Sequence, residues 1–211
     1  MDWLQIFTLV TGVLYIIFEI RQKNFMWVVG IATSLAAMWV FFRQGLYASF
    51  GLNTYYFITA FIGLWHWRRD KKSFTAAEDL PRVQEKANDT KDVIVLNRLS
   101  WNTVAVSFFA CVIIAVLLSA GMSYLHDIGI LSENPMSLLD SAVTALSVVA
   151  TWWLVRSYLE QWWLWIVADL MSTVLCATQG MWWMALLYIV YAASAVYGLK
   201  YWKERGAYLR D

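Results

Sequence analysis

The stretch Trp162-Trp163-Leu164-Trp165-Ile166-Val167-Ala168-Asp169 decides the fold. It places three indole rings and one carboxylate in an apolar run that continues to Cys176. In a helix, Trp162, Trp165 and Asp169 fall at i, i+3 and i+7, on one face. A carboxylate within a lipid-spanning helix is costly unless it faces protein or water, so it marks a functional site by default. The open alternative is an interfacial belt of aromatic rings with a structural Asp that caps or pairs with a neighbouring helix.

The composition of the whole chain indicates an integral membrane protein. Its 211 residues are 61% hydrophobic and 15% charged, with a mean hydropathy of +0.54. A soluble domain of this length is less apolar. The net charge of +1 gives no indication of nucleic-acid binding. Cys111 and Cys176 lie in apolar runs without CxxC spacing, so we expect packing residues, with no metal, cofactor or disulfide.

Seven apolar runs are long enough to cross about 30 Å of hydrocarbon. The first is followed by Arg21 and Lys23 without a cleavage site of small residues, which predicts a membrane helix and not a removed signal. We therefore predict an all-α integral membrane protein with seven transmembrane helices. The runs are Leu4 to Ile20, Met26 to Phe42, Leu46 to Trp67, Trp101 to Met122, Leu138 to Val155, Trp162 to Ala177 and Met181 to Tyr201.

The Lys and Arg residues are distributed unequally over the two faces that these spans define. An odd number of spans places the termini on opposite faces, and fifteen of the 16 basic residues then fall on the C-terminal face. Arg43 alone falls on the other face. The positive-inside rule predicts a cytoplasmic C-terminus and an outer N-terminus.

The chain also contains an internal repeat. A shift of 135 residues aligns two helices of each half, and internal symmetry of this kind is typical of transporter folds. The aligned pairs are Arg21 with Arg156, Trp27 with Trp162, Leu35 with Leu170, Gln44-Gly45 with Gln179-Gly180, Leu52 with Leu187, Tyr56 with Tyr191, Ala60 with Ala195, Gly63 with Gly198 and Trp67 with Trp202.

The repeat predicts a 3+1+3 architecture. Spans one to three and five to seven form two copies of a three-helix unit, and the fourth span inverts the chain so that the copies are parallel. We expect the substrate site near the midplane, between the copies. The predicted segments are residues 1–67 (repeat one), 68–100 (a solvated cytoplasmic connector that has room for a short surface helix), 101–125 (linker helix), 138–202 (repeat two) and 203–211 (cytoplasmic tail).

The candidate site combines many aromatic rings with few polar groups. Rings stack on flat ligands and attract cations, while Asp, Asn and Gln orient hydroxyls, so the pattern favours a heteroaromatic nucleoside or vitamin. Two alternatives stay open: Trp182 and Trp183 also fit an outer interfacial belt, and Asn53 also fits a hydrogen bond between helices. The candidate residues are Asn53, Tyr56, Trp162, Trp165, Asp169, Gln179, Trp182, Trp183, Tyr188 and Tyr191.

The WxxWxxxD pattern at Trp162, Trp165 and Asp169, followed by Leu187-Tyr188, Gly198 and Trp202, resembles the PnuC family of bacterial nicotinamide riboside transporters. The third span, with Asn53, Tyr56, Gly63 and Trp67, is similar to the matching helix of that family, and the resemblance covers nearly all of residues 1 to 205. Asn53 stands where Gln is expected in many relatives.

The resemblance implies a bundle like a full-length version of the SWEET sugar carriers, located in the bacterial inner membrane. It implies facilitated uptake of the riboside without a coupling ion, and trapping of the riboside by a cytoplasmic kinase. The family has members for thiamine and riboflavin, so these substrates stay open, as does homo-oligomerisation.

The sequence gives less support to ion-coupled transport and to enzymatic activity. Asp169 is the only acid well inside a span, whereas a proton relay needs a chain of such groups, so we expect passive exchange by rocking of the two copies. An intramembrane enzyme acting on lipid would need a His/Asp or metal constellation. The two histidines, His66 and His126, lie at a span end and in an outer loop, so we expect no enzyme. A plain sugar as cargo, and a membrane sensor or scaffold, stay open.

Overall fold

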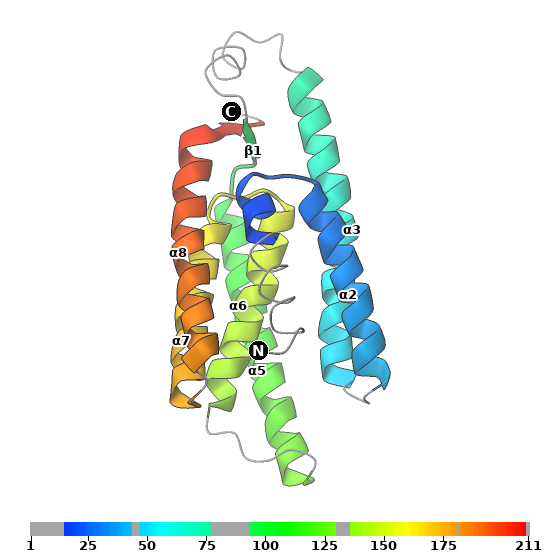
Figure 1. The fold of residues 1–211 in the computed structure, drawn as a ribbon, viewed down its shortest axis with the longest axis vertical. Coiled ribbons are helices and arrows are strands. Elements are labelled where there is room, and N and C mark those ends of the chain that lie inside the picture. Colours follow the sequence, from blue (N-terminus) through cyan, green and yellow to red (C-terminus); the bar gives the residue numbers. More distant parts are fainter. Residues whose placement is uncertain (1–14, 44–46, 77–92, 130–135, 181, 210–211) are drawn as a thin grey trace. The chain divides into compact units, whose positions relative to one another are not determined.

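The computed structural model describes residues 15–43, 47–76, 93–129, 136–180 and 182–209, without the side chains of 36–37, 40–43, 47–50, 74–76 and 183 (Figure 1). Most of these residues are helical, as predicted, and residues 15–20 are helical as well. The helices are α2 (Phe25–Arg43), α3 (Tyr47–Ala76), α5 (Trp101–Asp127), α6 (Ser137–Val155), α7 (Gln161–Thr178) and α8 (Trp182–Arg205). Two short strands, β1 (Ile94–Leu96) and β2 (Gly206–Tyr208), pair in parallel.

Three described helices are long and apolar enough to cross a membrane: Trp101–Asp127, Ser137–Val155 and Met184–Arg205. They correspond to the predicted fourth, fifth and seventh spans. Helix α5 has no buried residue along its length, so its apolar side chains are available to lipid. These features confirm the prediction of a helical membrane protein.

Several predicted boundaries shift or lie outside the described residues. The predicted first span, Leu4 to Ile20, is described from residue 15, and residues 77–92 of the predicted connector lie outside the described ranges, as do Gln44 and Gly45 of the repeat alignment. Helix α3 continues to Ala76, beyond the predicted end of the span at Trp67. No Gly or Pro follows Gly63 in this helix, and its last turns contain the helix-forming residues Arg68, Arg69, Lys71 and Lys72.

The chain forms two compact units. Unit 1 consists of Met1–Asn97, Leu154–Ser157 and Tyr201–Asp211, and unit 2 consists of Arg98–Trp153 and Tyr158–Lys200.

In unit 1, α2 packs along α3 (Figure 1). At this contact the ring of Trp27 lies against Gly63. A Cβ atom placed on Gly63 would lie 2.5 Å from the buried Trp27 ring, so the helices approach closely only because position 63 has no side chain. The Trp27 ring in turn meets the ring of Trp67 edge-on, with centroids 5.1 Å apart. The contact extends along the helix pair as a chain of indoles.

The ends of several helices meet in unit 1 at a cluster that we call the junction, made of Ile20, Gln22, Trp67, Val95, Leu154, Ser157 and Trp202. The Gln22 amide donates to the Val95 carbonyl (2.8 Å) and to Ser157 Oγ (3.2 Å), and accepts from the Val95 N–H (2.9 Å). Gln22 and Ser157, which are repeat counterparts, both have left-handed backbones, with φ of 47° and 55°. The two turns therefore share a conformation that is uncommon outside glycine.

Two tryptophans close the junction in a reciprocal way. The Trp67 indole donates to the Leu154 carbonyl (3.1 Å), and its repeat counterpart Trp202 donates to the Ile20 carbonyl (2.9 Å). Both rings are buried. Each copy of the predicted repeat thus supplies an indole to the turn that follows the first helix of the other copy.

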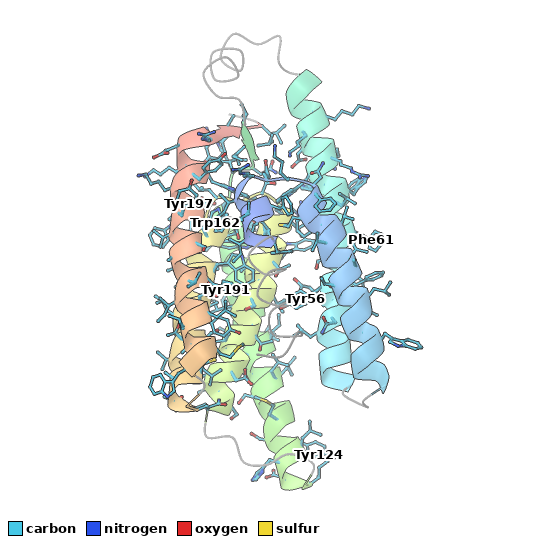
Figure 2. All side chains as sticks on the ribbon, viewed as in Figure 1. Tyr56, Phe61, Tyr124, Trp162, Tyr191 and Tyr197 are labelled. Atoms are coloured by element: carbon cyan, nitrogen blue, oxygen red, sulfur yellow. The ribbon has the colours of Figure 1, made fainter. Side chains whose placement is uncertain are left out.

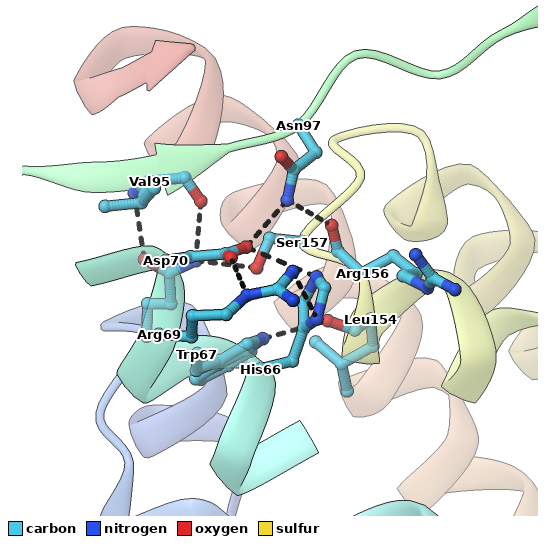
Figure 3. Close-up of polar contacts among 10 residues, drawn as sticks. His66, Trp67, Arg69, Asp70, Val95, Asn97, Leu154, Arg156 and Ser157 are labelled. Carbon is cyan, nitrogen blue, oxygen red and sulfur yellow. Dashed lines mark hydrogen bonds and ion pairs between the residues drawn. The ribbon is translucent and has the colours of Figure 1, made fainter. Parts of the chain in front are cut away.

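A polar cluster on α3 holds the segment that follows β1 (Figure 3). The buried Asp70 carboxylate accepts a hydrogen bond from Asn97 Nδ2 (2.8 Å) and pairs with His66 Nε2 (3.3 Å) and Arg69 Nε (3.7 Å). Asn97 Nδ2 also donates to the Arg156 carbonyl (2.9 Å). The charge on Asp70 is compensated by neighbours on its own helix, as a buried carboxylate requires.

In unit 2, α7 and α8 make the same contact that α2 and α3 make in unit 1. A Cβ atom on Gly198 would lie 2.5 Å from the Trp162 ring. These two residues are the repeat counterparts of Gly63 and Trp27. Helix α5 is tied to α6 by a hydrogen bond from the Trp153 indole to Ser107 Oγ (2.9 Å).

Candidate functional site

Helix α7 presents the predicted indole and acid face to the interior. No Gly or Pro interrupts Gln161–Thr178, so the helix keeps its period along the whole apolar run. Trp162 is 2% exposed and Asp169 is 7% exposed, whereas Trp163 on the opposite side is 58% exposed. Trp165 is half-buried on the inward side. Because Asp169 faces inward, its carboxyl can contact protein or ligand and avoids the cost of contact with lipid.

Asp169 lies beside two phenols of α8. Tyr188 and Tyr191 both interact electrostatically with the Asp169 carboxyl, and their rings meet edge-on with centroids 6.0 Å apart. Asp140, in the first turn of α6, also interacts with Tyr188. Carboxyls of α6 and α7 are therefore close enough to the phenols of α8 to influence them electrostatically. Figure 2 shows Tyr191 on α8.

Trp162 makes a packing contact between α7 and α8. Its ring covers Gly198 and is almost completely buried. The contact fixes the distance between α7 and α8, and so the placement of Asp169 against Tyr188 and Tyr191. A ligand contact by Trp162 stays a prediction.

Two of the remaining candidates of unit 2 lie at exposed helix ends, and the side chain of the third is not among the described residues. Gln179 is the exposed C-cap of α7, and Trp182 is 70% exposed in the first turn of α8. Exposure at a helix start fits the interfacial belt that stayed open for Trp182. The side chain of Trp183 lies outside the described residues.

The two candidates of unit 1 lie on α3. Asn53 and Tyr56 are half-buried, and the Tyr56 ring lies 5.6 Å from that of Tyr55. Tyr56 also interacts electrostatically with Tyr15, a ring of the first predicted span that our sequence interpretation did not single out. The Tyr15 ring lies 3.8 Å from the Cβ position of Gly30.

Sequence interpretation also missed Gln161, in the first turn of α7. Its side chain is completely buried, although Gln at the polar edge of an apolar run is expected at the surface. The signal that could have found it is the internal repeat, because its counterpart in the first copy is the apolar Met26.

Metal chemistry has no support in the described part of the chain. No group of three His, Cys, Asp or Glu side chains there is placed to hold a metal ion. Cys111 and Cys176 are free thiols. The candidate residues that the structure describes carry rings, phenols and carboxyls, which are groups suited to stacking and hydrogen bonding.

Three described helices have membrane-spanning length, and unit 2 carries buried rings and a buried carboxyl, as is expected of a multi-pass membrane transporter for small molecules. Residues 2–204 match the nicotinamide mononucleotide transporter family. The chain belongs to this family.

Curated relatives agree with this assignment. The chain is similar to the nicotinamide riboside transporter PnuC of Escherichia coli (strain K12), with 25% identity over 98% of this chain and 89% of the relative. The nicotinamide riboside transporter PnuC of Neisseria mucosa is 26% identical over 96% of this chain and 73% of the relative. The protein is therefore a multi-pass inner-membrane protein of a transporter family.

A solved structure shares the fold. The crystal structure of the vitamin B3 transporter PnuC covers 93% of this chain with a TM-score of 0.58 and 23% identity, and 79% of that chain is matched. At this level of identity the likeness speaks for the fold alone.

Proposed function

We propose that the protein carries nicotinamide riboside into the cytoplasm by facilitated diffusion. The observation that carries the proposal is the placement of the buried Asp169 beside Tyr188 and Tyr191, one turn of α7 after the half-buried Trp165. Nicotinamide riboside has a flat pyridinium cation, which rings and a carboxyl attract, and ribose hydroxyls, which carboxyls and phenols bind. Two relatives named for this riboside support the same substrate.

The same cluster favours the riboside over the mononucleotide for which the family is named. A phosphate needs Arg, Lys or backbone N–H donors, whereas the group on α6, α7 and α8 offers the two acids Asp140 and Asp169. Carboxylates repel a phosphate that lies beside them, which lowers the affinity for a phosphorylated ligand. We infer that a 5′-phosphate on the ligand weakens binding.

The proposed architecture is a pair of parallel three-helix copies joined by α5 as the inverting helix. Three features support it: the matching contacts Trp27 on Gly63 and Trp162 on Gly198, the reciprocal bonds of Trp67 and Trp202, and the left-handed backbones at Gln22 and Ser157. The asymmetry of Lys and Arg supports a cytoplasmic C-terminus and an outer N-terminus.

Transport is proposed to be passive, with the two copies rocking and a cytoplasmic kinase trapping the riboside by phosphorylation. Asn53, Tyr56, Trp162, Gln179, Trp182 and Trp183 stay proposed ligand contacts beside Trp165, Asp169, Tyr188 and Tyr191. Homo-oligomerisation stays a proposal as well.

Counterflow in proteoliposomes tests the function. Vesicles loaded with unlabelled nicotinamide riboside are expected to accumulate the labelled riboside without an ion gradient. Vesicles loaded with nicotinamide mononucleotide are expected to accumulate much less labelled riboside. Counterflow with thiamine or riboflavin and not with the riboside would move the assignment to another vitamin, and no counterflow with any of them would favour a sensor or scaffold.

A further inference from the structure

Gln161 has a completely buried side-chain amide without a hydrogen-bond partner among the described residues. Its side chain is 0% exposed, and neither Oε1 nor Nε2 has a partner within the part of the chain that the structure describes. Leaving a buried donor and acceptor unpaired lowers stability. Native proteins rarely retain such groups without a use for them.

The amide lies in a row with the indole and the acid of the candidate site. Gln161, Trp165 and Asp169 are at i, i+4 and i+8 of α7, so they fall within an arc of about 80° and a length of about 12 Å. Trp165 Nε1 is also buried without an acceptor among the described residues. One face of one helix therefore carries an unpaired amide and an unpaired N–H in consecutive turns, before the acid.

The internal repeat shows that packing does not require an amide at this position. The counterpart of Gln161 in the first copy is Met26, which is 0% exposed, like Gln161. Both residues are directly followed by the tryptophan that packs on a glycine, Trp162 in one copy and Trp27 in the other. The same local setting is thus occupied by an apolar side chain in one copy and by an unpaired polar one in the other.

We propose that Gln161 is a substrate-contacting residue, which extends the row of Trp165 and Asp169 by one turn. The inference rests on the proposed function, since it names a further part of the same site. The amide binds a neutral group that both donates and accepts hydrogen bonds, as the carboxamide and the ribose hydroxyls of nicotinamide riboside do. Trp165 Nε1 donates to an oxygen of the same ligand.

The test uses Gln161→Met, which gives the second copy the residue of the first. Two quantities are measured on the purified full-length protein: the thermal midpoint without ligand, and the Kd for nicotinamide riboside. The variant is expected to bind the riboside about fivefold to tenfold more weakly, because one or two neutral hydrogen bonds are lost. Without ligand it is expected to be as stable as the parent or to melt about 2–4 °C higher, because an unpaired amide has been removed.

Met26→Gln is the matched control, and Gln161→Leu is a second apolar variant. Met26→Gln is expected to melt at a lower temperature and to keep the Kd of the parent. Gln161→Leu is expected to repeat the result of Gln161→Met. A riboside analogue that lacks the carboxamide identifies the bound group: the loss on Gln161→Met disappears with this analogue if the amide contacts the carboxamide, and persists if it contacts the ribose.

Three results would overturn the inference: an unchanged Kd in both Gln161 variants, a clear drop in their ligand-free stability, or an equal weakening of binding by Met26→Gln. Failure of the proposed function has a different signature, because the parent protein would then not bind nicotinamide riboside at all.

Discussion

Units 1 and 2 each contain a tryptophan ring packed on a glycine of the neighbouring helix. The contact is the same in both units, but the residues around it differ. In each, an almost completely buried indole lies 2.5 Å from where a glycine Cβ would be, Trp27 on Gly63 and Trp162 on Gly198. The helices that carry them are related by one shift of 135 residues. The contact is therefore part of a shared scaffold and not of a ligand site that belongs to one copy.

The two units differ at the positions of Gln161, Trp165 and Asp169 on α7. Asp169 corresponds to Ser34, Gln161 to Met26 and Trp165 to Gly30. In unit 1 the Tyr15 ring lies 3.8 Å from the Cβ position of Gly30, and the counterpart of Tyr15 in the second copy is Ala150. The two copies therefore share their helix packing. Where their polar residues differ, a large side chain in one copy corresponds to a small one in the other, as Trp165 does to Gly30 and Tyr15 to Ala150.

The sharpest way to break the shared scaffold is to add a methyl group at either glycine. Gly63→Ala and Gly198→Ala each place a Cβ within 2.5 Å of an indole, so the ring or the helix must move. Overpacking of this kind costs about 2–3 kcal/mol, which exceeds the gain of about 1 kcal/mol from replacing Gly in a helix. Thermal unfolding should show a similar loss for both variants. Gly51→Ala is the control, since a Cβ there meets nothing within 4 Å. Stability unchanged in one of the two would show that the copies are not equivalent.

Substitutions at the junction are expected to lower stability by a smaller amount than those at the glycines. Trp67→Phe and Trp202→Phe each remove an indole donor and leave the carbonyl of Leu154 or Ile20 without it. Each loss should lower stability by about 1 kcal/mol. The two values, measured by thermal unfolding, should agree. A loss at Trp67 with none at Trp202 would contradict the reciprocal role of the two rings.

The smallest effect is expected on the outer side of α7. Trp163 is 58% exposed, next to the buried Trp162, and faces away from the acid. Trp163→Leu should leave riboside counterflow within a factor of about two and stability within about 0.5 kcal/mol, as surface substitutions do. A large loss of counterflow would place the site on the other face of the helix.

The sequence predicted the helices and the inward direction of Trp162 and Asp169, because both depend on the local period of apolar residues. It did not predict the junction. Neither Gln22 nor Ser157 is a residue type that signals a left-handed backbone, and β1 pairs with a strand far along the chain. Burial of Gln161 was missed because its position at the start of an apolar run resembles a polar helix end. Trp182 and Gln179 lie at exposed helix ends, and a ligand contact by either residue stays a prediction. The orientation of the termini stays a prediction.

We propose that the second copy binds the riboside through Asp169, whereas the first copy does not bind it through the equivalent residue, Ser34. The most direct measurement is the Kd of nicotinamide riboside for Asp169→Ser, which installs the residue of the first copy, beside Ser34→Ala. Loss of a carboxyl that binds hydroxyls or a cation should weaken binding about 30-fold to 100-fold in Asp169→Ser, and Ser34→Ala should bind as the parent does. Equal affinity of Asp169→Ser and the parent would contradict the claim.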